Sequence, residues 1–199
     1  ILINGDMVAM DSFSSWPPIH RQSNDFERDL DIVIKGIKVF LSNFDTVDYL
    51  MGNHEHRINR QTKGHINIGL FCKHILGLRC SDYSYCELTN SGKEVIICHP
   101  AEFSRVPLAV PRKLAMVHEK NVLVGHTHAL EWGYSDSGKY WIASGGHCRS
   151  EKRTQYISMK MTSYPKWNLG ASLIWKGEFY PIHPGNIDFW MNKVSPLDK

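Results

Sequence analysis

The sequence predicts a globular α/β protein, and three observations support that fold class. Stretches with helical periodicity alternate along the chain with short apolar runs, which are typical of buried strands. Several of these apolar runs end at a glycine followed by polar residues. The 199 residues, 42% hydrophobic and 22% charged, have the composition of an ordinary folded protein. We therefore expect a single domain over residues 1–199.

Chain composition and cysteine usage exclude several protein classes. No apolar run approaches the roughly 18 residues that span a bilayer, and from the residues at its start we expect no signal peptide. The five cysteines are scattered and include no C-x-x-C pair, which argues against a disulfide framework. Reduced cysteines favour a cytoplasmic protein, and we expect no membrane partner.

The first half of the chain predicts two strands and two helices in alternation. Residues 1–3 form the end of a buried strand, and the prolines at 17–18 keep the next segment irregular. Residues 24–41 form a helix. Its apolar face comprises Phe26, Leu30, Val33, Ile34, Ile37 and Leu41. Residues 46–51 predict the next strand, and residues 66–76 predict the second helix.

In the rest of the chain, the sequence predicts one further helix, one further strand and several hairpins. Residues 111–119 form the helix, with Pro111 suited to its first turn, and residues 121–124 form the strand. Each hairpin consists of two short apolar runs around a turn sequence. The paired runs are residues 83–88 with 94–98, 130–134 with 139–143, and 172–175 with 178–182.

Polar clusters follow four of the predicted strands. The clusters are Gly5-Asp6, residues 52–55, His99-Pro100 and residues 125–128. In open α/β sheets, ligands bind beyond the carboxyl ends of the strands. We therefore expect the four clusters to meet at one place.

The side chains in these clusters are suited to bind divalent metal ions. The candidate ligands are Asp6, Asn53, His99, His126 and His128. Carboxylate, amide oxygen and imidazole ligands are typical of sites for Mn, Fe, Zn or Co, and they differ from the thiolate ligands of cysteine zinc sites. Two such ions, about 3.5–4 Å apart, are a common clamp for in-line attack on a phosphoryl centre.

The order of the clusters resembles a known family. Asn4-Gly5-Asp6, Gly52-Asn53-His54-Glu55, His99 after a strand, and Gly125-His126-Thr127-His128 follow one another as in the calcineurin-like metallophosphoesterases. This family contains two-metal phosphatases, phosphodiesterases and nucleases. The resemblance covers roughly residues 1–147, and residues 52–60 are most similar to phage and prokaryotic members.

The resemblance implies a fold and a set of roles. The fold would be a four-layer α/β/β/α sandwich of two mixed sheets, with C-terminal strands and a basic loop region in residues 148–199. Asp6 would bridge two divalent ions. Asn53, His99 and His126 would complete one ion site, and His128 would belong to the other. His54 would face the substrate phosphate as general acid or electrostatic stabiliser. Mn²⁺ is the expected ion, with Fe, Zn, Co or Ni as the other options.

One family motif is missing. An Asp-x-His at the end of the family's first strand supplies two ligands to the ion of His128, and this sequence contains no Asp-x-His. The family's first strand and first helix are missing too. Three interpretations remain open. The sequence is an N-terminal truncation; or Asp11, His20 or Asp25 substitutes for the motif; or one ion site has decayed and the protein is a binding module.

Other residues have candidate roles around this site. Arg57 and Arg149 are predicted to contact substrate phosphate, because a guanidinium matches its shape, although Arg57 also suits a solvated helix start. Glu55 is expected to support a ligand histidine, and His147 either lines the rim or is structural. Basic and aromatic residues mix over residues 149–167, which suits either nucleic-acid contact or a solvated loop.

These features predict a divalent-metal-dependent phosphoester hydrolase. The favoured activity is that of a phosphodiesterase or nuclease, in which two ions activate a water and the substrate is a phosphoester such as DNA or RNA. The alternatives are a phosphomonoesterase and a non-catalytic binding protein with an incomplete metal site. The oligomeric state is left open.

Overall fold

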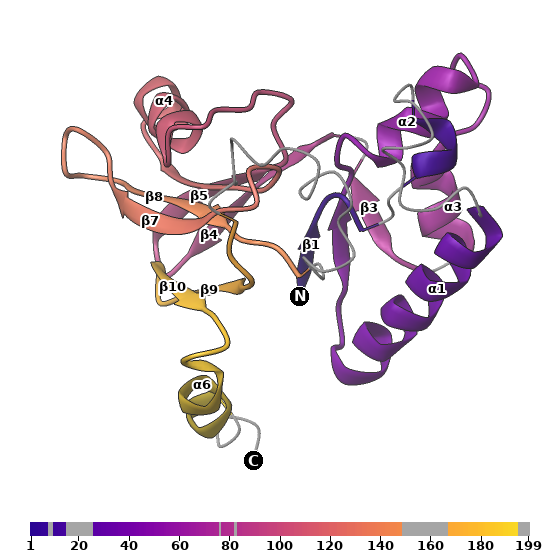
Figure 1. Cartoon of the computed structure of the whole chain (residues 1–199). Coiled ribbons are helices and arrows are strands. Elements are labelled where there is room, and N and C mark those ends of the chain that lie inside the picture. The colour runs from indigo at the N-terminus through magenta and orange to yellow at the C-terminus, as the bar shows by residue number, and fades with distance from the viewer. Residues whose placement is uncertain (8–9, 15–25, 76, 82, 149–166, 195–199) are drawn as a thin grey trace. The chain divides into compact units, whose positions relative to one another are not determined.

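The computed structural model describes residues 1–7, 10–14, 26–75, 77–81, 83–148 and 167–194 (Figure 1). Within these residues, the structure confirms the predicted α/β class. The strands form three sheets, with orders β1-β2-β3, β4-β5-β6-β8-β7 and β10-β9. The chain divides into two compact units. The first contains residues 1–86 and 98–101, and the second contains residues 87–97 and most of the chain after residue 102.

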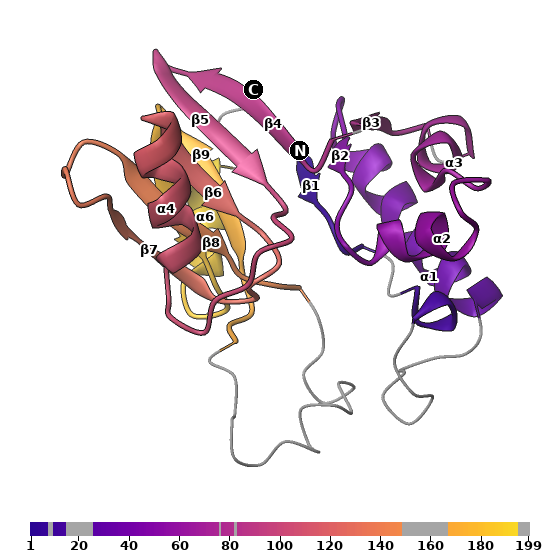
Figure 2. The ribbon, with the colours of Figure 1, turned by 90° about the horizontal axis from the view of Figure 1, so that it is seen from above.

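The first unit is built on a parallel sheet of three short strands. The strands are β1 (Leu2–Asn4), β2 (Asp48–Leu50) and β3 (Arg79–Ser81). In the register of this sheet, Ile3 pairs with Tyr49 and Tyr49 with Cys80. Helices α1 (Phe26–Asn43), α2 (Glu55–Gln61) and α3 (Ile68–Ile75) lie on one side of the sheet (Figures 1 and 2). A short 3-10 turn, η1, spans Asp11–Phe13.

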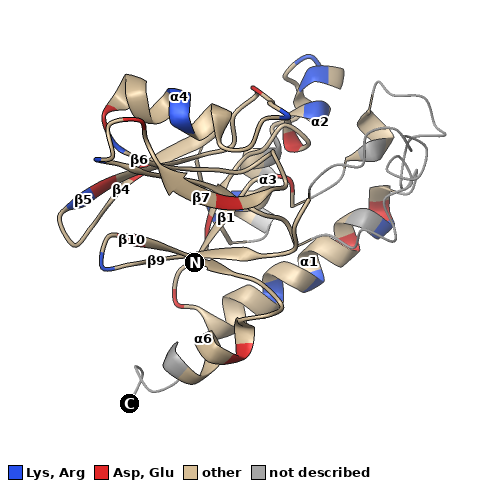
Figure 3. Ribbon diagram, turned by 60° about the vertical axis from the view of Figure 1, so that its left-hand side comes forward, with Lys and Arg blue, Asp and Glu red and all other residues tan. Residues whose placement is uncertain are grey.

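Helix α1 confirms the longest predicted helix and corrects one residue of its inner face. Val33 and Ile37 are buried against Tyr49 in the core of the first unit. Leu41 is 40% exposed, and Phe40 packs on the core instead. At 3.6 residues per turn, residues 40 and 41 flank the inner line that continues from Ile37, and the larger ring takes the buried place. Acidic and basic residues are interspersed along the rest of α1 (Figure 3).

The second unit is built on a mixed sheet. Its strands are β4 (Tyr85–Asn90), β5 (Lys93–Cys98), β6 (Asn121–Val124), β7 (Leu130–Tyr134) and β8 (Trp141–Gly145), and the first and last residues of the β4–β5 hairpin belong to the first unit. Strand β8 pairs in parallel with β6 and antiparallel with β7. Helix α4 (Ala109–His118) packs on β6 and β8. The hairpin of β9 (Ala171–Trp175) and β10 (Glu178–Ile182) contacts β7 and β8 and precedes α6 (Ile187–Val194).

The core of the second unit lies where the β9–β10 hairpin meets the mixed sheet. Trp141 is buried, and its indole N–H donates to the Gly177 carbonyl at 2.9 Å. Its ring centroid lies 5.7 Å from that of Phe179. All four residues of β6 are buried, so the sequence shows an unbroken apolar run there rather than an alternation. This core holds the turn after β6, which carries two of the predicted ligands.

In the described part of the chain, no helix is both long enough and apolar enough to cross a membrane.

Candidate metal-binding site

The turns after β1 and β2 lie close together, and both contain predicted ligands. These strands are parallel neighbours, and Asn4 pairs with Leu50 at their carboxyl ends. A Cβ atom added to Gly5 would lie 2.7 Å from the Cα atom of Gly52, and one added to Gly52 would clash with Asp6. Gly5 also has a φ of +73°, a conformation that glycine adopts without strain. Both glycines are therefore needed for this approach of the two turns.

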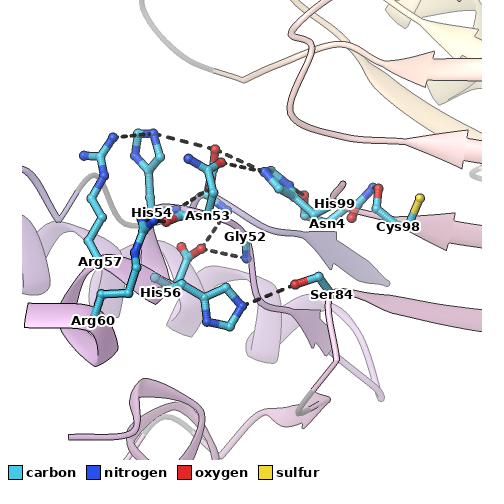
Figure 4. A network of polar contacts seen from close by, with 12 residues as sticks. Asn4, Gly52, Asn53, His54, His56, Arg57, Arg60, Ser84, Cys98 and His99 are labelled. Atoms are coloured by element: carbon cyan, nitrogen blue, oxygen red, sulfur yellow. Dashed lines mark hydrogen bonds and ion pairs between the residues drawn. The ribbon is translucent and has the colours of Figure 1, made fainter. Parts of the chain in front are cut away.

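His99 joins these turns from the end of β5. Its Nδ1 donates to the Asn4 carbonyl at 2.9 Å, and its backbone N–H donates to the Ser84 carbonyl at 2.7 Å. The Asn4 amide in turn donates to the Cys98 carbonyl at 3.1 Å. These bonds fix the imidazole ring and direct its Nε2 atom away from Asn4 (Figure 4). Histidines that bind metals are commonly held in this way, by a hydrogen bond from the other ring nitrogen to a carbonyl.

Three candidate ligand atoms converge in the first unit. His99 Nε2 lies 3.3 Å from Asp6 Oδ2 and 3.1 Å from Asn53 Oδ1. A carboxylate oxygen, an amide oxygen and an imidazole nitrogen form a donor set that accepts Mn²⁺, Fe²⁺, Co²⁺ or Zn²⁺. The residues therefore fit a divalent ion. Their roles as ligands remain predictions.

Asp6 and His99 shift each other's protonation. Burial alone would raise the pKa of the Asp6 carboxyl, but its hydrogen bond with His99 and the charges of His54 and His99 hold this pKa well below its ordinary value. Burial alone would lower the pKa of His99, yet the Asp6 carboxylate and the Asn4 carbonyl raise it. Without an ion, the Asp6 carboxylate thus favours the protonated form of His99. A divalent cation would replace the proton on Nε2.

The stability of the metal-free protein should therefore have a maximum in mildly acidic solution. The contribution of Asp6 to the free energy of unfolding is present above its unfolded pKa of about 3.9 and is lost as the pH falls through its lowered folded pKa. The contribution of His99 is present below its unfolded pKa of about 6.5 and is lost as the pH rises through the raised folded pKa. Urea unfolding in EDTA across this range checks the maximum. The variant Asp6→Asn should flatten it, and an equal maximum in the variant would contradict the pairing.

The Glu55 side chain accepts hydrogen bonds from both turns. Its side chain is fully buried, and Oε2 accepts the backbone N–H groups of Gly52 at 2.8 Å and of Asp6 at 3.0 Å. Hydrogen bonds to a buried carboxylate are stronger than neutral ones. Sequence reasoning expected Glu55 to support a histidine and missed this contact with the backbone of the ligand turns. The Asn-His-Glu run alone does not reveal it, because the acceptor depends on how the two strands pair.

His54 and two arginines surround the same turn. The backbone N–H of His54 donates to Asp6 Oδ1 at 3.0 Å, and its Nε2 lies 3.8 Å from Asp6 Oδ2. Arg57 Nη2 lies 3.0 Å from His54 Nε2, and Arg60 Nη2 donates to the Asn53 carbonyl at 3.5 Å (Figure 4). Arg57 thus lies next to His54, and its contact with substrate phosphate stays a prediction.

His126 and His128 lie in the second unit, on the turn after β6. Their φ angles are +68° and +61°, and Asp6 in the first unit has a φ of +52°. Non-glycine residues rarely adopt this conformation, and such strain is concentrated at functional sites. The His128 ring lies 4.6 Å from that of Trp167 and 5.5 Å from that of His147, centroid to centroid. The participation of His126 and His128 in an ion site remains a prediction.

Several predicted residues lie outside the described residues. Arg149, His20 and Asp25 are among them, as is nearly all of the basic and aromatic segment 149–167. Asp11 opens the η1 turn. The backbone of His147 pairs with that of Asn168, because the His147 N–H donates to the Asn168 carbonyl at 3.1 Å.

Comparisons with known proteins give distant structural similarities. No protein-family model matches the chain, and no curated protein matches it. The chain is similar to a solved archaeal phosphodiesterase at 13% identity and a TM-score of 0.41, over 76% of this chain and 74% of the other. It is also similar to hypothetical protein PH1004 of Pyrococcus horikoshii OT3 at 14% identity and a TM-score of 0.48, over 100% and 81%. Likenesses this weak carry no functional argument.

Proposed function

We propose that this protein is a divalent-metal-dependent phosphoester hydrolase that acts on phosphodiesters, with nucleic acid as the favoured substrate. The observation that carries the proposal is the convergence of Asp6 Oδ2 and Asn53 Oδ1 on His99 Nε2, with the other nitrogen of His99 held by a carbonyl. The Gly5 and Gly52 backbones make room for this arrangement. A purely structural cluster does not need a donor set of this kind.

The proposed ion ligands are the five residues that the strand-end motifs of the sequence single out. Asp6, Asn53 and His99 would bind one ion together with His126, and Asp6 and His128 would bind a second. The proposed physiological ion is Mn²⁺. When bound, the ions would neutralise charge on the phosphoryl oxygens and activate a water. The strained turn that carries His126 and His128 supports their inclusion.

The chain's own side chains would bind and orient the substrate. Asp6 stays ionised because its neighbours hold its pKa low, so its negative charge is available to cations at any moderate pH. His54 is fixed through its backbone to Asp6 and would face the leaving oxygen. Arg57 would move its guanidinium from His54 to a non-bridging phosphate oxygen, for which it has the right geometry.

Metal content and substrate preference test this function together. The protein purified with Mn²⁺ should hold two ions per chain by elemental analysis. It should hydrolyse bis(p-nitrophenyl) phosphate faster than p-nitrophenyl phosphate, and EDTA should abolish both reactions. One ion would indicate a half-built site. No ion and no hydrolysis would contradict the proposal and favour the non-catalytic binding protein, whose support is the missing Asp-x-His motif.

A further inference from the structure

A well-anchored loop presents an exposed aromatic ring beside His126. The loop, residues 102–108, follows His99 and leads into α4. Lys113 Nζ binds the Glu102 carboxylate at 2.7 and 3.0 Å, and Ser104 Oγ accepts the Val106 N–H at 3.1 Å. These two contacts flank Phe103 in the chain, and its side chain is 54% exposed.

The Phe103 ring touches a candidate ligand and leaves most of its own surface open. Its centroid lies 6.0 Å from that of His126, and the two planes meet at 88°. An edge-to-face pair covers at most one face of either ring, so the exposed fraction of Phe103 includes area on which another flat ring could stack. Trp167 differs, since it is only partly exposed and packs on His128 and His147.

We propose that Phe103 is a stacking platform for a nucleobase of single-stranded nucleic acid. This inference rests on the proposed function, because it assumes that His126 lies beside the reacting phosphodiester. A base is attached one sugar away from its phosphate, so an aromatic ring in contact with a ligand histidine is suitably placed to receive it. Stacking of a base on an aromatic side chain contributes about 1–3 kcal/mol. Arg105, exposed two residues further on, adds positive charge for the backbone.

Among the residues that the structure describes, the other exposed aromatic rings do not have this combination of features. Tyr134 on β7 is also 54% exposed, but its ring pairs with Trp132 at 6.1 Å. Tyr83 and Tyr85 pair with each other at 5.6 Å. Single exposed aromatic residues are common on protein surfaces and need no function. The contact with His126 is what distinguishes Phe103, and Tyr134 offers a matched control.

The test separates base contacts from backbone contacts. Fluorescein-labelled oligothymidylate and an abasic oligomer of equal length are titrated with the whole protein in EDTA at low salt. Phe103→Ala should weaken binding of oligothymidylate by about 5- to 150-fold, the equivalent of about 1–3 kcal/mol. Its affinity for the abasic oligomer should equal that of the wild type. Phe103→Trp should bind like the wild type, and Tyr134→Ala should change neither affinity.

Two results would overturn the platform. One is an equal loss of affinity for both oligomers in Phe103→Ala, and the other is wild-type protein that does not prefer oligothymidylate to the abasic oligomer. Failure of the proposed function is a separate result. If the Mn²⁺-loaded protein hydrolyses no phosphodiester but the base-dependent loss is present, the protein binds nucleic acid without cleaving it. If hydrolysis is present without the loss, only the platform is wrong.

Discussion

Replacement of Asp6 by asparagine should reduce Mn²⁺-dependent hydrolysis of bis(p-nitrophenyl) phosphate by about 10³-fold, or about 4 kcal/mol of transition-state stabilisation. Asparagine has nearly the same size, and its oxygen can still accept the His54 N–H that Oδ1 now accepts. The substitution therefore preserves the turn and removes the negative charge. Elemental analysis should show a parallel loss of bound Mn²⁺, because Asp6 is proposed to bridge both ions.

A matched control separates this effect from a general loss of acidic charge. Asp31 lies on the solvent side of α1 and pairs with Lys35 at 2.6 Å. The variant Asp31→Asn should keep wild-type activity and metal content, since an exposed pair contributes only about 0–1 kcal/mol. Full activity in Asp6→Asn would exclude the proposed mechanism. Loss of activity with unchanged Mn²⁺ content would place Asp6 in the reaction but not among the ligands.

The sequence predicted most of the regular structure because apolar periodicity reports burial. Strand β6 matches residues 121–124, and α1 ends two residues later than predicted. Among the described residues, four elements were missed: α2, α6, β3 and the short η1 turn. Helix α2 has seven residues, of which only Glu55 and Ile58 are buried, so it has no clear apolar stripe. Strand β3 has three residues, too few for a recognisable alternation.

The candidate site was predictable to the extent that it depends on strand ends. Asp6, Asn53 and His99 follow β1, β2 and β5, and they meet in the first unit as expected. What the sequence could not predict are the contacts made across strands. The bond from His99 to the Asn4 carbonyl joins residues 95 positions apart, and the bond from Asp6 to Glu55 spans 49. Such contacts depend on strand order, which local patterns do not encode.

These long-range contacts explain why polar residues can converge in a buried place. An unpaired carboxylate there would be costly, and the Asp6 and Glu55 carboxylates instead have defined partners. Asp6 accepts the His54 N–H and faces His99, while Glu55 neutralises the backbone dipoles of both turns. The cluster thus fixes the positions of the proposed ligands through the protein's own hydrogen bonds. Preorganisation of this kind raises affinity because little ordering is left for the binding step.

Glu55 carries much of this preorganisation, so Glu55→Ala should lower the free energy of unfolding by about 3 kcal/mol. The substitution leaves the N–H groups of Gly52 and Asp6 without the carboxylate that now accepts them. A buried group deprived of its partner costs about 1–3 kcal/mol, and more when the partner was charged. Urea unfolding in EDTA at neutral pH measures the loss. Glu55→Gln, which keeps one acceptor oxygen, should lose only about 1 kcal/mol.

The affinity for Mn²⁺ then distinguishes a residue that positions the turns of Asp6 and Gly52 from an ordinary core residue. Glu55→Ala should weaken Mn²⁺ binding by about 10- to 100-fold, because its loss frees the Asp6 turn to move. Val33→Ala removes buried methyl groups from the α1 core, breaks no hydrogen bond to the turns of Asp6 and Gly52, and should also destabilise the protein. Its Mn²⁺ affinity should nevertheless stay at the wild-type value under conditions where both variants are folded. Equal affinities in the two variants would show that Glu55 stabilises the fold without positioning Asp6.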